Sequence, residues 1–446
     1  MTTSRIRTGM ALALALALGT AGCNILDVNN PNNLTQQDVE NVAAANAVVN
    51  GALATTMRGI DAMALPFMQV SDELKWIGSR DAWLQLDHGN VSDPNNEFVD
   101  AAFPSLAQGR WMADLAVSTI QGHLADDPSN SDLNEDMARA SFIKGMIYSY
   151  IAQYMQSFAF SDRTEPGPEI PAASMDRVFG QAIEALDQAV SQAQAVGDSD
   201  LALKALAVRA QAKHARAVRA KYNPTYSPGD GLVNDAGAKS DAAAVIAQVG
   251  TTSDWKYDFI FSSSTIGSSR GAWINQRAEQ IFGARYAETD PASPASVIGF
   301  PFMDPIDNVS DPRVKTAIED FLAAQSFPSL TIASAREMHL ILAEAELASG
   351  NTAGAIMHIN HVRSITGMSP YSENENGVSV KDMLIHERTA NLFGQGRRLP
   401  DMYRFGIASD NWLPDSEAMT APGGLLPITC VEIRANPEIQ TGRSRC

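Results

Sequence analysis

One five-residue run, Gly267-Ser-Ser-Arg-Gly271, satisfies the G-x-S-x-G pattern of serine hydrolases. In such enzymes a strand-to-helix turn exposes the serine, and an acid and a histidine activate its hydroxyl. Ser269 would be the nucleophile, and Asp311 and His339 are candidates for its acid and base. That chemistry needs alternating strands and helices, whereas the surrounding sequence is helical. We therefore interpret the pattern as accidental and keep a secreted serine hydrolase as an alternative.

Metal-binding patterns are sparse in the sequence. His358 and His361 share one face of a predicted helix, but no HExxH motif or cysteine cluster completes a ligand set. The acidic segments 126–136 and 304–311 carry oxygen ligands suited to calcium, without the glycine-centred twelve-residue spacing of an EF-hand. The sequence predicts no metal and no cofactor, with calcium at these acidic segments as the alternative.

Two stretches combine tryptophan with polar side chains, as expected of a sugar-binding surface. Aromatic rings offer flat apolar faces for sugar rings, while Asp, Gln and Arg can bond to hydroxyl groups. The candidate ligand-binding residues are Asp72, Trp76, Arg80, Asp81, Trp83, Trp273, Gln276 and Arg285. Each of these tryptophans is weighed against a buried role, because Trp also packs readily in cores. Trp111, inside a predicted helix, is assigned to the core.

Charge and composition exclude some functional classes. The 446 residues carry a net charge of −18, which disfavours binding to nucleic acid and to anionic ligands. Hydrophobic residues make up 45% and charged residues 19%, so the chain can bury a large core and is not of the disordered type.

The first residues have the features of an export signal. Met1–Gly22 contains two arginines, an Ala-Leu run too short to span a bilayer, and small residues before Cys23. The Ala-Gly-Cys junction predicts a lipoprotein, in which Cys23 is acylated and anchors the mature chain to a membrane. Thr20 stands where leucine is usual, so ordinary secretion is the alternative. Residues 23–33, which are rich in Asn, would form the tether.

Two cysteines, Cys430 and Cys446, would remain after lipidation in an oxidising compartment, where they can pair. Sequence spacing does not fix the geometry of a disulfide. Buried free thiols therefore stay open as the alternative.

Helical periodicity dominates the chain. Helices with alanine at the contacts are predicted at residues 35–57, 103–124, 136–158, 175–195 and 201–222. A further pair, 335–350 and 352–367, has the length and alanine content of a tetratricopeptide hairpin. Between residues 223 and 330 the periodicity disappears except in the segment Ala272–Phe282.

The predicted fold is mostly α, an α-solenoid scaffold of tetratricopeptide-like hairpins with long irregular loop regions. Long loops in a compact protein are usually functional. The expected regions are a helical scaffold at 34–222 with a binding-loop insertion at 70–104, a loop-rich region at 223–330, and a helical region at 331–446.

The C-terminal region also carries a specific set of motifs. They are Arg336-Glu337, Ala343-Glu344-Ala345, Asn360 with Arg363, Glu387-Arg388, Gly396 with Arg398, Asp401 with Arg404, Leu425–Ile428 and Asn436-Pro437. This set resembles the signature of the SusD/RagB family of nutrient-binding outer-membrane lipoproteins. We interpret the residues Glu387, Arg388, Arg398, Asp401 and Arg404 as a structural ion-pair network rather than as ligand contacts.

The resemblance implies a role as well as a fold. It implies a non-catalytic lipoprotein, anchored at the outer-membrane surface, that captures oligosaccharides or related nutrients. It also implies a partner, a SusC-like TonB-dependent barrel transporter to which the nutrient is delivered. A purely structural tetratricopeptide interaction scaffold, without a small-molecule pocket, is the remaining alternative.

Overall fold

The computed structural model describes residues 41–162 and 165–446. The predicted signal peptide, the predicted tether and Cys23, the predicted lipidation site, lie outside the described residues. The chain divides into two units, Met1–Ala44 and Ala45–Cys446. In the first, Val42–Ala44 forms a short 3-10 helix, η1. All elements below belong to the second unit.

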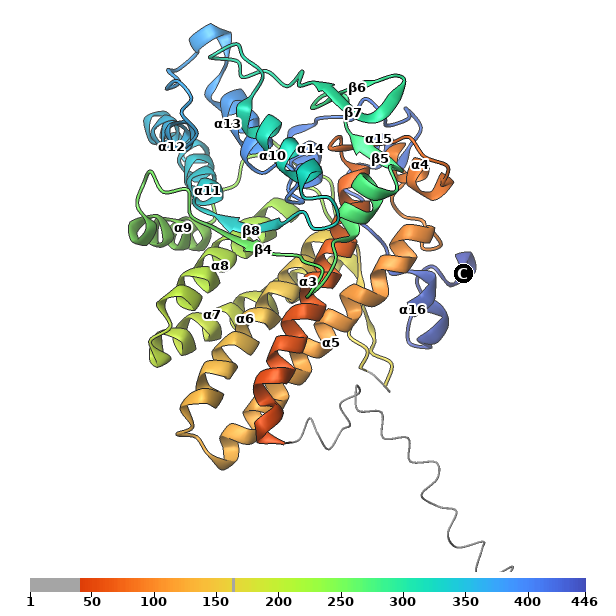
Figure 1. Cartoon of the computed structure of the whole chain (residues 1–446), viewed down its shortest axis with the longest axis vertical. Coiled ribbons are helices and arrows are strands. Elements are labelled where there is room, and N and C mark those ends of the chain that lie inside the picture. Colours follow the sequence, from red (N-terminus) through yellow and green to blue (C-terminus); the bar gives the residue numbers. More distant parts are fainter. Residues whose placement is uncertain (1–40, 163–164) are drawn as a thin grey trace, which may run out of the picture. The chain divides into compact units, whose positions relative to one another are not determined.

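Long helices form the first half of this unit and lie side by side (Figure 1). They are α3 (Ala45–Val70), α5 (Glu97–Asp126), α6 (Ser131–Tyr154), α7 (Asp176–Val196) and α8 (Ser199–Arg219). Side-chain caps begin three of them, because Asn96, Asn130 and Asp198 accept hydrogen bonds from backbone N–H groups of the first turn. Short connections make α5 with α6, and α7 with α8, antiparallel pairs.

Two glycines bring the backbones of α3 and α5 together. A Cβ atom at Gly59 would lie 2.7 Å from the carbonyl oxygen of Ser105, and one at Gly109 would lie 3.0 Å from that of Thr55. Any larger residue at Gly59 would therefore push the two helices apart.

The second half contains the helical hairpin predicted from the sequence. Its helices are α11 (Ala335–Ala348) and α12 (Thr352–Ile365), followed by α13 (Val380–Asn391) and α14 (Arg398–Phe405). Leu340, Ile359, Val362 and Leu384 pack in one core between α11, α12 and α13. The structure is mostly helical, which confirms the predicted fold class.

The region 223–330 is less irregular than predicted. It contains α9 (Ala236–Val249), α10 (Pro312–Ala323) and a π-helical turn, η3 (Gly271–Gln276). The alanine-rich α9 has a weak apolar stripe, so periodicity missed it, although Asp235 caps it. Asp311, followed by proline, caps the start of α10, and this pair is a helix-start signal in the sequence.

Short antiparallel strand pairs connect these helices. They are β1 (Leu74–Trp76) with β5 (Gln280–Phe282), β2 (Phe158–Ala159) with β3 (Glu169–Ile170), β4 (Lys256–Phe259) with β8 (Leu330–Ser334), and β6 (Glu288–Asp290) with β7 (Ser293–Gly299). The remaining short elements are α4 (Asp81–Asp87), α15 (Glu417–Thr420), α16 (Cys430–Ala435), η2 (Ala172–Ser174), η4 (Glu375–Gly377) and η5 (Arg443–Arg445).

In residues 41–162 and 165–446, no helix combines the length and the apolar composition that crossing a bilayer requires.

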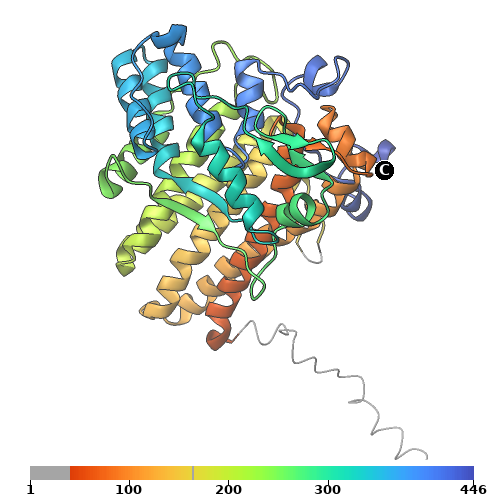
Figure 2. The ribbon, with the colours of Figure 1, turned by 45° about the horizontal axis from the view of Figure 1, so that its top comes forward.

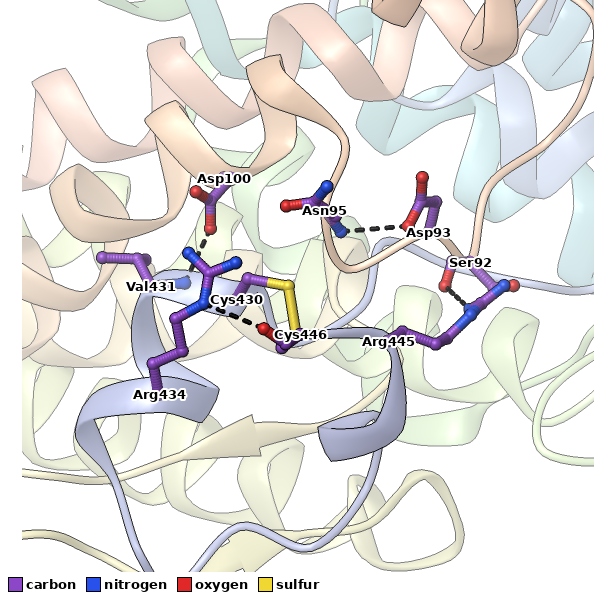
Figure 3. Close-up of a disulfide and its surroundings, with 9 residues drawn as sticks. All are labelled: Ser92, Asp93, Asn95, Asp100, Cys430, Val431, Arg434, Arg445 and Cys446. Atoms are coloured by element: carbon purple, nitrogen blue, oxygen red, sulfur yellow. Dashed lines mark hydrogen bonds between the residues drawn. A yellow bond between two sulfur atoms is a disulfide. The ribbon is translucent and has the colours of Figure 1, made fainter.

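The C-terminal tail is closed by a disulfide between Cys430 and Cys446, whose Cα atoms lie 5.3 Å apart (Figure 3). Cys430 begins α16 and is fully buried. Next to Cys446, the Arg445 guanidinium donates a hydrogen bond of 2.6 Å to the carbonyl oxygen of Ser92. The crosslink therefore fastens the tail beside the segment that leads into α5.

Replacing both Cys430 and Cys446 with alanine is expected to lower the free energy of unfolding by about 3 kcal/mol, because the unfolded chain gains the freedom of the opened loop. Denaturant unfolding with and without reductant measures this effect. Reduced wild-type protein should converge on the double variant. Two alkylatable thiols at these positions in the native, non-reduced protein would contradict the expectation.

Candidate functional site

The first cluster of motif residues, the Glu344 cluster, joins α8, α11, α13 and α14. The carboxylate of Glu344 lies 3.0 Å from Nη2 of Arg404 and 3.0 Å from Nε2 of His214. Arg388 and Arg404 also pair with Asp401, each at 2.8 Å. Burial disfavours ionised Glu344, but Arg404, His214 and Arg388 outweigh it and hold the pKa of this carboxyl well below its usual value. The cluster is therefore charged and fully enclosed.

A second cluster, the Glu387 cluster, joins α10, α12, α13 and the loop before α10. Arg363 donates to Glu387 at 2.9 Å and to Asp304 at 2.8 Å. Arg313 donates to Glu387 and to Asp311. Although burial opposes ionisation, hydrogen bonds from His386 and Arg363 to Asp304, and from Arg313 and His386 to Asp311, hold the pKa of both carboxyls below the usual range. Arginines thus neutralise the acidic segment 304–311, one of the two segments considered as calcium sites.

A third group of buried contacts centres on Asp72. The prediction that Asp72 contacts a ligand is wrong. The Asp72 carboxylate accepts two hydrogen bonds from Arg398, at 2.7 and 2.6 Å, and one from the Tyr286 hydroxyl at 2.8 Å. The neighbouring Glu73 accepts from the backbone N–H of Gly394, and burial raises the pKa of Glu73 to about 7. Asp72 and Glu73 therefore hold β1 against the loop before α14.

These contacts confirm that the motif residues Glu387, Arg388, Arg398, Asp401 and Arg404 form a structural ion-pair network. In some pairs, such as Arg388 with Asp401, the motifs contain both partners. In others they contain only one, because Asp72, the partner of Arg398, and Asp304, a partner of Arg363, come from segments far away in the chain and carry no motif.

Trp83, also predicted to contact ligand, belongs to the core instead. Its side chain is 1% exposed, and its ring stacks on Phe98 with a centroid distance of 3.9 Å. Trp273 meets it edge-on at 5.6 Å. A sugar ring could reach the face of Trp83 only by displacing Phe98. The prediction failed because α4 is a helix of seven residues, in which Trp83 and Leu86 share the buried face.

The other predicted residues lie at the surface or at its edge. Trp76 and Trp273 are half-buried, whereas Arg80, Asp81, Gln276 and Arg285 are exposed. We call these six residues the β1–β5 rim: Trp76, Arg80, Asp81, Trp273, Gln276 and Arg285. The pairing of β1 with β5 sets Trp76 opposite Gln280, and the backbone N–H of Ser79 donates to the carboxylate of Glu279. These contacts bring together two spans about 200 residues apart in the sequence. Figure 2 shows the orange segment with α4 beside the green segment with β5 to β7.

Some rim residues already have protein partners. Arg80 pairs with Glu97 at 3.0 Å, and Gln276 bonds to the hydroxyl of Ser326. The guanidinium of Arg277 lies over the ring of Trp273, 4.5 Å from its centroid. One face of Trp273 is thus covered, and Trp76 is the other half-buried tryptophan of the rim.

A groove of about 440 Å³ lies between α10, the β4–β8 pair and the loop after α13. Phe321 and Phe393 supply apolar surface to it, and Lys256, Asp320 and Arg336 supply charges. Its volume falls within the range of small-molecule sites. No sequence pattern predicts this groove, because its walls come from distant segments of the chain and no single segment carries a binding pattern.

Ser269 lies in a segment that docks onto α3 rather than in a nucleophile elbow. Its backbone N–H donates to Asp61, and Arg270 donates to the same carboxylate at 2.7 Å. Asp311 is bound by an arginine, and His339 lies against Thr251. Among the described residues, the sheets are antiparallel pairs. The parts that a serine hydrolase would need are therefore engaged in other contacts.

Comparison with known proteins gives a family match in the C-terminal region. The model of the SusD family matches residues 336–424. None of the curated proteins compared matches the chain.

Solved structures share the fold of nearly the whole chain. A SusD superfamily protein from Bacteroides vulgatus ATCC 8482 is 15% identical, with a TM-score of 0.63 over 90% of this chain and 98% of the other. A SusD superfamily protein from Bacteroides fragilis is 13% identical, with a TM-score of 0.61 over 90% of this chain and 99% of the other. A laminarin binding SusD-like protein is 15% identical, with a TM-score of 0.59 over 89% of this chain and 98% of the other. At these identities the likeness is one of fold. The chain is therefore similar to the SusD family model at residues 336–424, and it shares the fold of SusD superfamily structures over nearly its whole length.

Proposed function

We propose that the protein is a non-catalytic lipoprotein of the outer membrane that captures oligosaccharides or related nutrients. It delivers them to a SusC-like TonB-dependent barrel transporter. The observation that carries the proposal is the SusD family match over residues 336–424, in which the charged motif residues other than Arg336 lie in buried ion pairs. The shared fold with a laminarin binding SusD-like protein supports carbohydrate as the class of ligand.

The ligand surface proposed here is the β1–β5 rim. Trp76 offers part of an indole face, and the charged and amide side chains around it supply donors and acceptors for hydroxyl groups. The side chains of Arg80 and Asp81 lie at the exposed edge, where hydrogen bonds to hydroxyl groups need no burial of charge. The rim therefore combines a flat apolar face with a polar border.

Trp76→Ala is expected to weaken binding of a laminarin-derived oligosaccharide by about 0.5–1.5 kcal/mol, taking aromatic stacking as the guide. That loss is roughly two- to tenfold in Kd. Calorimetric titration measures the affinity, and a thermal melt of the same protein should barely change. Trp111→Ala, a half-buried tryptophan in α5, serves as the matched control and should leave the affinity unchanged.

A large loss of stability in Trp76→Ala, with unchanged affinity in the folded fraction, would remove Trp76 from the ligand surface. Ala317→Arg, which fills the groove beside α10, tests the other cavity. If this variant alone loses binding, the sugar site moves from the rim to the groove.

The wider function is tested by purification in mild detergent from cells grown on the nutrient, followed by a glycan array. Co-purification of a barrel protein together with glycan binding supports the proposal. A folded protein with neither property would favour the structural scaffold. Ester hydrolysis that disappears in Ser269→Ala would favour the serine hydrolase.

A further inference from the structure

Three histidines meet where α11 and α12 pack together. His339, in α11, is fully buried, and His358 and His361, in α12, are half-buried. The ring centroid of His339 lies 5.4 Å from that of His358 and 5.1 Å from that of His361. The centroids of His358 and His361 are 6.2 Å apart. None of the three belongs to the family motif of this region.

A backbone carbonyl fixes the orientation of the central ring. Nε2 of His339 lies 3.1 Å from the carbonyl oxygen of Thr251. Because a carbonyl can only accept, Nε2 must carry the proton and donate it. The lone pair of a neutral His339 is then on Nδ1, and this atom lies 3.1 Å from Nδ1 of His358. In a metal-ligating histidine, one ring nitrogen commonly donates to a carbonyl oxygen while the other binds the metal. A bound ion would here replace the contact between the Nδ1 atoms of His339 and His358.

The spacing of the rings fits a tetrahedral ion. With Zn–N bonds of about 2.0–2.1 Å, two ligand nitrogens lie roughly 3.3 Å apart and the centres of their rings about 5 Å apart. The Nδ1 atoms of His339 and His358 are close to the first spacing, and the centroid distances from His339 to His358 and to His361 are close to the second. His358 and His361 are farther apart, at 6.2 Å, so the His361 side chain would have to turn to complete the ligand set.

We propose that His339, His358 and His361 bind one Zn²⁺ ion, with the fourth position open to water or to another ligand. Imidazole nitrogen is a preferred ligand of zinc, and three histidines with one open position form a known type of zinc site. This site is separate from the β1–β5 rim and does not depend on the proposed function.

The test uses the full chain without an affinity tag, stripped with a chelator and titrated with ZnCl₂ at pH 7.5 in a calorimeter. We expect one ion per chain and a rise of the thermal midpoint with zinc. His358→Ala and His361→Ala should each weaken the affinity at least about tenfold, the smaller of the losses seen even for outer-shell partners. CaCl₂ should give no shift, because calcium takes oxygen ligands.

His123→Ala is the matched control, since His123 is a half-buried histidine on α5 outside this group. It should bind zinc as the wild type does. Melts without metal show whether each variant is folded. Equal zinc affinity in wild type and His358→Ala would overturn the proposal, as would weak binding at many sites, which indicates surface carboxylates. An unchanged affinity in His361→Ala alone would overturn the three-histidine site.

Discussion

Glu344→Ala is expected to lower the free energy of unfolding by about 3–5 kcal/mol, the cost of removing one partner from a buried ion pair. Glu344 is fully buried and faces Arg404, Arg388 and His214. It also accepts a hydrogen bond of 3.0 Å from the backbone N–H of Val233. Without its carboxylate, two enclosed arginines keep only Asp401 as a counter-charge. Urea unfolding followed by circular dichroism measures the loss.

Glu346→Ala, two residues further along α11, is the matched control. Glu346 lies nearer the surface and pairs with Lys239, so its removal should cost less than about 1 kcal/mol. If the two variants unfold at the same urea concentration, the Glu344 cluster contributes no more than a surface pair. The assignment of the motif residues to the scaffold would then lose its energetic basis.

Trp83→Ala is expected to lower the free energy of unfolding by about 3–5 kcal/mol, the range for truncating a buried aromatic side chain. The ring fills the space between Phe98 and Trp273, and both contacts are lost with it. Trp83→Phe retains most of the packing and should cost much less. Thermal and urea melts of the two variants measure the difference.

Trp76→Ala provides the comparison within the same short span, because Trp76 is half-buried and Trp83 is 1% exposed. We expect Trp83→Ala to reduce stability and Trp76→Ala to reduce affinity. A Trp83→Ala protein of unchanged stability with impaired sugar binding would return Trp83 to the ligand surface.

Strong periodicity predicted helices to within a few residues. The helix expected at 175–195 is α7, Asp176–Val196, in which Phe179 and Leu186 form part of the buried stripe. Alanine-rich segments gave weaker signals, since alanine fits both a buried face and an exposed one. For this reason α9 was missed, and α3 runs on to Val70, beyond its predicted end at residue 57.

Burial in the candidate site was harder to predict than composition. The sequence placed two tryptophans and their polar neighbours in one span, and the structure pairs that span with the region around Trp273. Which tryptophan faces inward depends on Phe98, which comes from another helix. The role of Asp72 depends in the same way on Arg398, 326 residues away in sequence. Partners at such separations leave no local pattern.

These separations also bear on how the chain reaches its native state. Glu417 binds the backbone N–H groups of Val91 and Ser92, at 2.8 and 2.7 Å, across more than 320 residues. Such closures contribute only after nearly the whole polypeptide is available, and their loop entropy slows folding. In a chain made from its N-terminus, α3 to α5 are therefore synthesised long before α14 and α15. Until α14 is made, Asp72 lacks its counter-charge, Arg398. During that interval, protection from premature aggregation matters most for the first-made helices.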